Sequence, residues 1–237
     1  MKILSIDTSS NICSVALLEN SNLIKEKTVD DLKTHSEVLL PLTSELFTET
    51  NLTLKNIDLI VCDKGPGSFT GIRIGVATAI AFSDSLGINS IGINSLEALA
   101  YNIKKDGIIC SLIDAKNNNV YFGLYKLENG NYTLLNTLHL DNIEIILNSL
   151  EQEFSKDSKI TFVGDGAVNY KSLIEKILPN SIFSLQNNLS SYNLGLAGYK
   201  SYLNKDTNDV MPLYLRKSQA ERELEEKNKK YRKWVIF

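Results

Sequence analysis

The sequence predicts an α/β fold made of two halves of similar design, and two observations support this prediction. First, an apolar strand ending in Ile-Asp, a polar turn and a second apolar strand occur twice, in LSIDTSSNICSVAL (4–17) and SLIDAKNNNVYFGLY (111–125), with Asp7 and Asp114 at matching positions. Second, a strand followed by a glycine turn and a helix-like segment occurs at GPGSFTGIRIG (65–75) and again at KITFVGDGA (159–167). Repetition of this kind favours a duplicated α/β unit.

The first half contains alternating short apolar runs and amphipathic segments. The strands expected there are 2–7, 12–18, 57–62 and 90–93, with a polar loop after residue 18. The run at 57–62 is continuously apolar, which is typical of a central parallel strand. The helices expected there are 34–50, 72–85 and 95–103. Pro41 lies inside the first helix, so a kink or break is expected near Leu40.

The second half repeats the design and ends in a change of composition. Helical spacing is expected at 170–178, and a helix at 193–203 is expected to cross back over the fold. From 218 to 233 the chain is dense in charge, with Glu preceding Lys at i,i+4, which predicts a solvated helix. The chain is therefore divided into 1–104, 105–216 and 217–237.

Composition limits the classes of function. The chain has 237 residues and a net charge of −3, and an acidic balance disfavours unaided nucleic-acid binding. Cys13, Cys62 and Cys110 lie in or beside apolar runs and form no CxxC pair, so we expect buried, reduced thiols in a cytoplasmic protein. Neither a signal peptide nor an apolar stretch of membrane-spanning length is visible.

The glycine segment 65–75 matches neither common phosphate-binding loop. It lacks the Lys-Ser or Lys-Thr of a Walker loop, and its GxGxxxG spacing differs from the dinucleotide fingerprint. The small residues of the helix that follows recur every four positions: Gly71, Gly75, Ala79 and Ser83. Such a flat face serves core packing more often than an interface, although a helix N-terminus also attracts anions.

No metal or nucleophilic site is predicted. His35 and His139, the two histidines of the chain, lie in different halves, and an HxxxH pair is absent. His139 is interpreted as a surface or strand-edge residue. No GxSxG nucleophile turn is present. Asp7 and Asp114, taken alone, are interpreted as residues that cap the polar turns after them.

Seven motifs in order resemble the TsaB family, also called YeaZ, within the superfamily of actin, the sugar kinases and the Hsp70 ATPases. They are IDTSS (6–10), HSE (35–37), GPGSFTGIRIG (65–75), SLEALA (95–100), IDA (113–115), GDGA (164–167) and PLYLRKSQAE (212–221). The resemblance extends to about residue 226. It implies the duplicated actin-like, ribonuclease H-like fold, with an N-terminal half that carries the partner-binding helices.

The resemblance implies a role in tRNA modification without catalysis. Members of the family are non-catalytic subunits that dimerise with TsaD, a paralogue that holds the metal and transfers threonylcarbamoyl to the adenosine beside the anticodon. A TsaE-like ATPase binds the assembled pair, and the subunit forms a homodimer when alone. The resemblance therefore implies tRNA contact through the complex, no cofactor and no membrane, and the older glycoprotease label is judged wrong.

The resemblance also implies two sets of residues. The expected partner interface lies on the helices 34–50 and 72–85, with its first-helix members and Ile74, Thr78 and Phe82 facing outward: His35, Leu39, Leu42, Leu46, Gly71, Ile74, Gly75, Thr78, Ala79 and Phe82. The positions of a vestigial nucleotide site are Asp7, Ser9, Gly65, Gly67, Asp114, Gly164 and Gly166. The metal-binding HxxxH of the catalytic paralogue is interrupted here, because Leu39 stands four residues after His35.

Two alternatives remain at this point. An active ATPase or phosphotransferase of the actin-like superfamily would bind ATP as an isolated chain, against which the absence of known phosphate loops counts. A metalloprotease would need ligands that two separated histidines do not supply.

Overall fold

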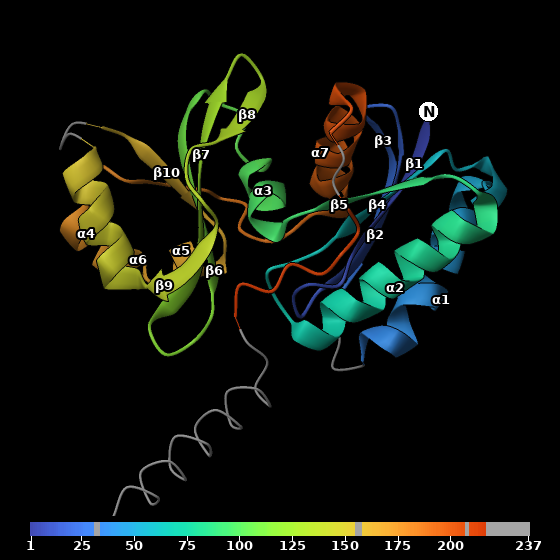
Figure 1. The fold of residues 1–237 in the computed structure, drawn as a ribbon, viewed down its shortest axis with the longest axis horizontal. Helices are drawn as coiled ribbons and strands as arrows, with labels where there is room; N and C mark the ends of the chain where they lie inside the picture. Colours follow the sequence, from blue (N-terminus) through green and yellow to red (C-terminus); the bar gives the residue numbers. More distant parts are fainter. Residues whose placement is uncertain (31–33, 155–157, 207–208, 217–237) are drawn as a thin grey trace, which may run out of the picture.

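The computed structural model describes residues 1–30, 34–154, 158–206 and 209–216. The predicted charged helix at 218–233 and the apolar end WVIF lie outside the described residues. Two β-sheets stand side by side, each with helices packed on it, and α3 and α7 lie between them (Figure 1). Within the described residues, no helix combines the length and apolarity needed to cross a bilayer.

The first sheet has the strand order β3-β2-β1-β4-β5. Its strands are β1 (Lys2–Asp7), β2 (Cys13–Glu19), β3 (Asn22–Val29), β4 (Leu59–Asp63) and β5 (Asn89–Ile93). The second sheet has the order β11-β10-β6-β7-β8, with β9 beside β7. Its strands are β6 (Gly107–Asp114), β7 (Asn119–Glu128), β8 (Asn131–Leu134), β9 (His139–Asn142), β10 (Ile160–Val163) and β11 (Ile182–Phe183).

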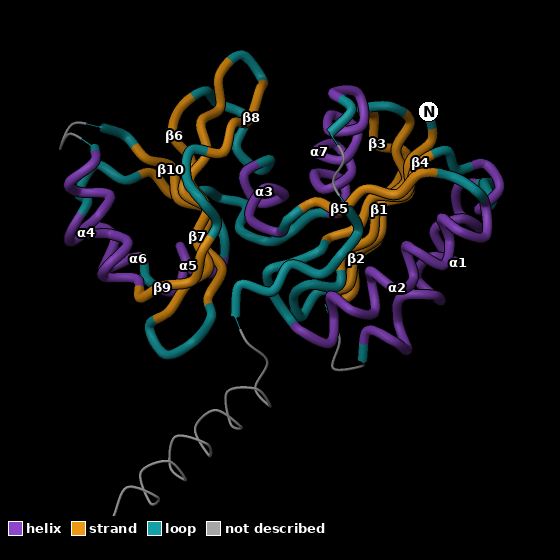
Figure 2. The backbone as a smooth tube through the Cα atoms, viewed as in Figure 1, coloured by secondary structure: helices purple, strands orange, loops and turns teal. Residues whose placement is uncertain are grey.

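The helices lie between groups of one to four strands along the chain, and α5 is followed directly by α6 (Figure 2). They are α1 (His35–Thr50), α2 (Phe69–Leu86), α3 (Ser95–Ala100), α4 (Ile143–Glu153), α5 (Asp165–Asn169), α6 (Lys171–Ile177) and α7 (Ser191–Asn204). A 3-10 turn, Leu54–Asn56, precedes β4.

The predicted repeat is present in the topology. In the first sheet, β1 pairs antiparallel with β2 and parallel with β4. In the second sheet, β6 pairs antiparallel with β7 and parallel with β10. Asp7 and Asp114 end the first strand of each unit, as the sequence predicts. The run at 57–62 corresponds to β4, which lies between β1 and β5 and is parallel to both.

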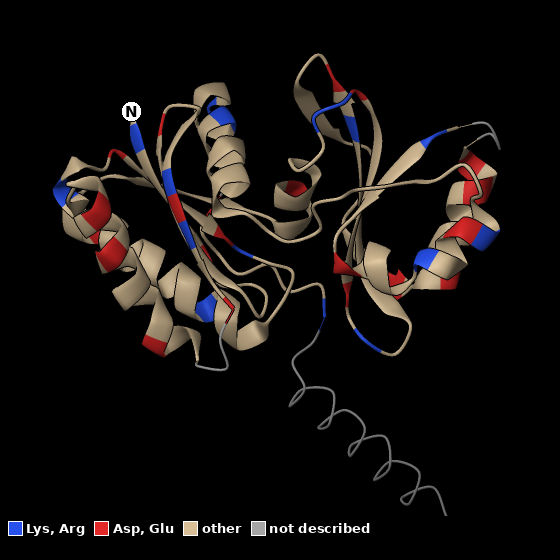
Figure 3. Cartoon of the chain, turned by 180° about the vertical axis from the view of Figure 1, so that it is seen from behind, with Lys and Arg blue, Asp and Glu red and all other residues tan. Residues whose placement is uncertain are grey.

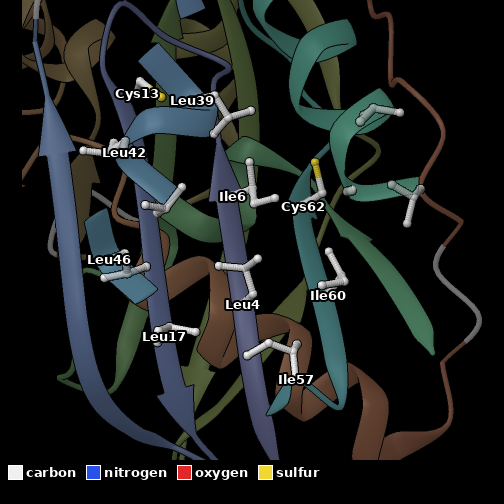
Figure 4. Close-up of a cluster of buried hydrophobic side chains, with 14 of the residues drawn as sticks. Leu4, Ile6, Cys13, Leu17, Leu39, Leu42, Leu46, Ile57, Ile60 and Cys62 are labelled. Atoms are coloured by element: carbon white, nitrogen blue, oxygen red, sulfur yellow. The ribbon is translucent and has the colours of Figure 1, made fainter. Parts of the chain in front are cut away.

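The core of the first lobe lies between its sheet and the helices α1 and α2. Leucines of α1 contact the side chains of β1, β2 and β4 (Figure 4). On the opposite face of this sheet, α7 packs closely against β4. The approach requires a glycine at Gly198, because a Cβ atom there would overlap the side chain of Val61. The sheet is therefore covered on both faces, which explains its continuously apolar strands.

Two helices pack against the sheet formed by the other half of the sequence. The helix α3 belongs to the segment 1–104, yet its Leu96 and Leu99 share a core with Ile109 of the second sheet. The helix α7 belongs to the segment 105–216, yet it packs on the first sheet. The expectation that 193–203 crosses back is confirmed. A cut near residue 104 therefore separates the two sheets but not the helices packed on them.

The first lobe differs from the sequence prediction at two places. The polar segment after residue 18 is a strand, β3, rather than a loop, because edge-strand pairing with β2 does not require apolar side chains on an open face. The helix α1 continues through Pro41. Pro41 is exposed, so water can reach the carbonyl that loses its N–H partner at this position.

In the second lobe, the strands β8 and β9 and the helix α4 had no counterpart in the sequence prediction. The side chain of His139 is exposed at the start of β9, at an edge of the pairing with β7, so the interpretation of His139 as a strand-edge residue is confirmed. The three cysteines are buried and free, as expected.

Candidate partner-binding face and interlobe cleft

The surface of α1 and α2 that points away from the sheet carries exposed apolar and small residues. We name this surface the outer face; its exposed members are Leu40, Pro41, Ser44, Ala77, Ile80 and Ala81. The charged residues of α2, Arg73 and Asp84, lie toward its two ends (Figure 3). An uncharged, partly apolar stretch of about ten residues on an exposed helix is typical of a protein contact surface.

A groove of about 420 Å³ lies between the two helices at one end of the outer face. Its apolar lining comes from Leu40, Phe47, Leu52, Leu54 and Phe82. None of the residues that line the groove is charged. The acidic residues Glu45 and Glu49 of α1 pair instead with Lys27 of β3, at 2.7 and 2.6 Å. The groove is therefore a mainly apolar depression.

More than half of the residues expected at the interface point inward. Leu39, Leu42 and Leu46 are buried against the sheet, so the prediction that they face outward is wrong. Their spacing defines the apolar stripe of α1, and a sheet able to bury that stripe lies directly beneath it. Leu40 stands one residue further around the helix and is exposed instead.

The small-residue face of α2 also points inward. A Cβ atom at Gly71 would overlap the carbonyl oxygen of Thr8, and one at Gly75 would overlap the Thr8 hydroxyl. Ala79 is fully buried in the same core. These residues let α2 approach the turn after β1, where the Thr8 hydroxyl donates to the Gly71 carbonyl at 2.8 Å. The small-residue face thus packs in the core of the described chain, and a contact of these three residues with a partner stays a prediction.

The remaining predicted interface residues lie at the borders of the outer face. Ile74, Thr78 and Phe82 are half-buried on α2, and Ile74 and Phe82 contact the core at its edge. His35 begins α1, and its Nε2 lies 2.7 Å from the carbonyl oxygen of Ser10, so Nε2 carries the proton. His35 thereby ties the start of α1 to the β1–β2 turn. Within the described residues, no three His, Cys, Asp or Glu side chains gather where they could hold a metal.

The second candidate site is a cleft of about 500 Å³ between the two lobes. Of the predicted nucleotide-site positions, Ser9, Gly67 and Asp114 line it. Among the described residues, the carboxylates that line the cleft are those of Asp30, Asp114 and Asp165, and the cations are Lys116 and Arg216. This balance opposes a bound triphosphate unless a further cation accompanies it.

The carboxylate of Asp114 accepts its hydrogen bonds from residues of its own lobe. Its carboxylate accepts from the Lys116 backbone N–H at 2.8 Å, from Lys116 Nζ at 2.9 Å and from Asn169 at 3.0 Å. Partial burial tends to raise the pKa of Asp114, but the hydrogen bonds from Lys116 outweigh it and lower the pKa below its usual value. Asp165 also fixes the backbone at Asp114, because its carboxylate accepts a hydrogen bond from the Asp114 backbone N–H at 2.9 Å.

Three predicted glycines serve packing and do not line the cleft. Gly164 has φ of +108°, and a Cβ atom there would overlap the carbonyl of Leu112. Gly166 would bring a Cβ atom against the Leu112 side chain. Gly65 has φ of +97° and lies against Ile72 and the backbone of Leu213. Positive φ and close approach both favour glycine at such positions.

Asp7 is not among the residues that line the cleft, and it lies beside Asp63, which was not among the predicted site residues. Asp63 ends β4, next to Asp7 at the end of β1, and both side chains are 1% exposed. The one available signal was position, since Asp63 directly precedes the glycine segment at the same end of a parallel strand.

The C-terminal part of the described chain, residues 209–216, runs beside the start of α2. Tyr214 stacks on Phe69 with ring centroids 4.3 Å apart, and Arg73 Nε donates to the Tyr214 hydroxyl at 2.8 Å. The Leu213 N–H donates to the Lys64 carbonyl at 2.7 Å, and Arg216 donates to the Ala115 carbonyl at 2.9 Å. This segment therefore connects the glycine segment of the first lobe with the second lobe.

The chain is similar to known proteins in both sequence and structure. The family model described as "TsaD: tRNA N6-adenosine threonylcarbamoyltransferase" matches residues 29–224. The chain is 35% identical over 225 residues to the tRNA threonylcarbamoyladenosine biosynthesis protein TsaB of Bacillus subtilis, covering 93% of this chain and 96% of that protein. It is 32% identical to TsaB of Haemophilus influenzae, with 91% and 94% covered.

The structural neighbours agree with these relatives. YeaZ from Pseudomonas aeruginosa superposes with a TM-score of 0.73 and 25% identity, over 90% of this chain and 99% of that one. A putative N-acetylmannosamine kinase from Listeria monocytogenes superposes with a TM-score of 0.52 at 11% identity, over 86% of this chain and 100% of that one. The second likeness concerns the fold alone, and it agrees with the predicted actin-like α/β architecture.

Proposed function

The chain belongs to the TsaB family, and from this premise we propose that it acts in tRNA threonylcarbamoyladenosine biosynthesis as a non-catalytic subunit that dimerises with a TsaD-like paralogue. The observation that carries the proposal is the continuous match over 96% of the Bacillus subtilis TsaB protein. In the proposed complex the paralogue modifies the adenosine beside the anticodon. A TsaE-like ATPase binds the assembled pair, and tRNA is reached through the complex in the cytoplasm.

The outer face of α1 and α2 is the proposed contact surface for the paralogue. Its uncharged centre on α2 and the adjoining apolar groove support this assignment. Exposed Leu40 and Ile80 supply apolar area, while Ala77 and Ala81 permit close approach of another helix. The same surface would serve a homodimer of the isolated chain, so the paralogue and a second copy would compete for it.

The hydrogen bonds and the charge balance in the interlobe cleft support a role without catalysis. Asp114 is engaged by Lys116 and Asn169, and the described carboxylates that line the cleft outnumber its cations. The position that corresponds to the second histidine of an HxxxH pair is Leu39, which is buried in the core and is not a ligand. These observations count against the alternative of an active actin-like ATPase and against a metalloprotease.

Two measurements on the full chain test the proposal. Light scattering is followed while the TsaD-like paralogue from the same organism is titrated in, and ATP binding to the chain alone is measured by calorimetry. We expect a one-to-one complex and no heat of ATP binding. Tight ATP binding without a partner would instead establish the chain as a nucleotide-binding enzyme, and failure to associate would remove the scaffold role.

A further inference from the structure

Asp7 and Asp63 form a buried carboxyl pair that the proposed function does not use. Ile6 of β1 pairs with Cys62 of the parallel strand β4, so the next residue on each strand is an aspartate. Both aspartates are 1% exposed. None of the ion pairs found among the described residues includes either of them. Two ionised carboxylates side by side in this buried environment would repel each other, which is strongly unfavourable.

The hydrogen bonds around the pair are unequal. Asp63 Oδ1 accepts from the Gly65 N–H and from the Ser95 hydroxyl, both at 2.7 Å, and its Oδ2 accepts from the Ser9 hydroxyl at 3.1 Å. Asp7 Oδ1 accepts from the Ser9 N–H at 2.8 Å. Asp7 Oδ2 is buried and receives no N–H or hydroxyl donor from the described residues. An orphaned acceptor of this kind requires an explanation.

We propose that Asp7 and Asp63 share one proton in the folded protein at neutral pH, held between the orphaned Oδ2 of Asp7 and the Asp63 carboxyl. The single proton removes one of the two buried charges and supplies the missing hydrogen bond. Proton sharing between adjacent carboxyls is the established solution where two such groups occupy one site.

The electrostatics of the surroundings agree with this assignment. Burial raises the pKa of Asp7, while hydrogen bonds from Ser9, the charge of His35 and the hydrogen bond from Asp63 lower it again in part. Burial and then the charge of Asp7 raise the pKa of Asp63 well above its usual value. The other titratable groups that face the pair are the thiols of Cys13 and Cys62. Burial therefore raises the pKa of both aspartates, as a pair that shares one proton requires.

The shared proton holds together the loops that position α1 and α2. Asp63 binds the glycine segment through Gly65 and the start of α3 through Ser95, while Ser9 bridges the two carboxyls. The turn that contains Ser9 in turn binds the start of α2, because the Ser68 N–H donates to the Ser9 carbonyl at 2.6 Å. Loss of the proton would place two repelling carboxylates at the junction of these loops.

The direction of the pH effect follows from the raised pKa values. A carboxyl whose pKa is higher in the folded than in the unfolded chain contributes stability that is present at low pH and is lost as pH rises through the folded value. The stability that the protonated Asp7–Asp63 pair contributes to these loops is therefore lost at alkaline pH. Asp114, at the matching position of the second lobe, has a lowered pKa and provides an internal control of opposite sign.

The test is carbon NMR of the full-length chain labelled at the aspartate carboxyl carbon, followed from acid to alkaline pH. Asp7→Asn and Asp63→Asn assign the two signals independently, so one poorly folded variant does not prevent the assignment. We expect one proton to remain on the pair at neutral pH and to leave only on the alkaline side, while the Asp114 signal is already that of a carboxylate. Ionised signals for both Asp7 and Asp63 at neutral pH would overturn the proposal.

A stability measurement separates a proton from a bound cation. The amide introduced by Asp63→Asn can donate to Asp7 at every pH, so this variant is expected to lose less stability than the parent chain as pH rises, with a slope smaller by about one proton. Asp114→Asn should leave the alkaline slope unchanged. Signals of Asp7 and Asp63 that shift with added Na⁺, K⁺ or Mg²⁺ at neutral pH would show a cation at the pair and contradict the proposal.

Discussion

Leu39 and Leu40 are adjacent in α1 but lie on different faces of the helix, with Leu39 1% exposed and Leu40 55% exposed. Leu39 packs against the first sheet (Figure 4), whereas Leu40 lines the groove on the outer face. This pair separates the residues of α1 that hold the lobe together from those available to a partner.

Truncation of the two leucines should therefore have unequal consequences for stability. Leu39→Ala is expected to lower the free energy of unfolding by about 2–5 kcal/mol, because it removes buried apolar contacts and leaves a cavity. Leu40→Ala should change it by less than about 0.5 kcal/mol. Chemical denaturation of both variants measures the difference, and equal losses would contradict the assignment of the two faces.

Charge on the outer face should block the proposed partner without unfolding the chain. Leu40→Glu combined with Ile80→Glu is expected to reduce affinity for the TsaD-like paralogue at least about tenfold, since two buried uncompensated carboxylates oppose association. The matched control is Ile145→Glu, a similarly exposed apolar position on α4 of the other lobe. Light scattering with each variant decides the matter, and undiminished binding by the double variant would place the interface elsewhere.

Enlarging the small residues of α2 should damage the fold before it affects any partner. Gly71→Ala introduces a Cβ atom into the carbonyl of Thr8, and we expect a loss of roughly 1–3 kcal/mol with backbone displacement. Ala81→Ser, on the exposed side of the same helix, serves as the control and should be nearly neutral. Thermal unfolding reports both. A fully stable Gly71→Ala chain with reduced partner binding would favour the original interface reading of this residue.

Asp114 should stabilise the second lobe only while it is ionised. Its pKa is lowered, so its contribution is present above the unfolded-state pKa and is lost as pH falls through the folded value. Because Lys116 is largely exposed, we expect Asp114→Asn to cost no more than about 1 kcal/mol at neutral pH and nothing in strong acid. Unfolding measured at both pH values checks this, and a loss that persists in acid would indicate a packing role instead.

The cysteine thiols should resist alkylation in the native chain. Burial, followed by the charge of Asp7, raises the pKa of Cys13 to about 12, and burial raises those of Cys62 and Cys110 well above the usual range. Thiolate is the reactive form, so native protein should react slowly at mildly alkaline pH and all three thiols should react rapidly in denaturant. Fast labelling of any one of them in the folded chain would reveal local opening at that strand.

The order of the elements was largely predictable because it rests on local chemistry. Ile-Asp before a polar turn identifies the end of the first strand in each lobe, and the apolar run at 57–62 identifies a central strand. The motifs around these elements are specific enough to identify the family, which the relatives and structural neighbours confirm. The strand β3 and the small edge strands were less predictable, since edge pairing depends on a neighbouring backbone and requires little apolar pattern.

The sequence by itself determined the repeated α/β design, the family and the residues at the two strand ends. The tertiary structure alone decided how those residues are used. Helical periodicity marks an apolar stripe on α1 but does not say whether a sheet or a partner covers it, and the sheet covers Leu39. Spacing along the chain likewise places Asp7 and Asp114 at equivalent positions. Only the packing of β4 beside β1 buries Asp7 against Asp63, while Asp114 remains beside Lys116. Burial and charge neighbours come from segments distant in sequence, and these set the chemistry of a side chain.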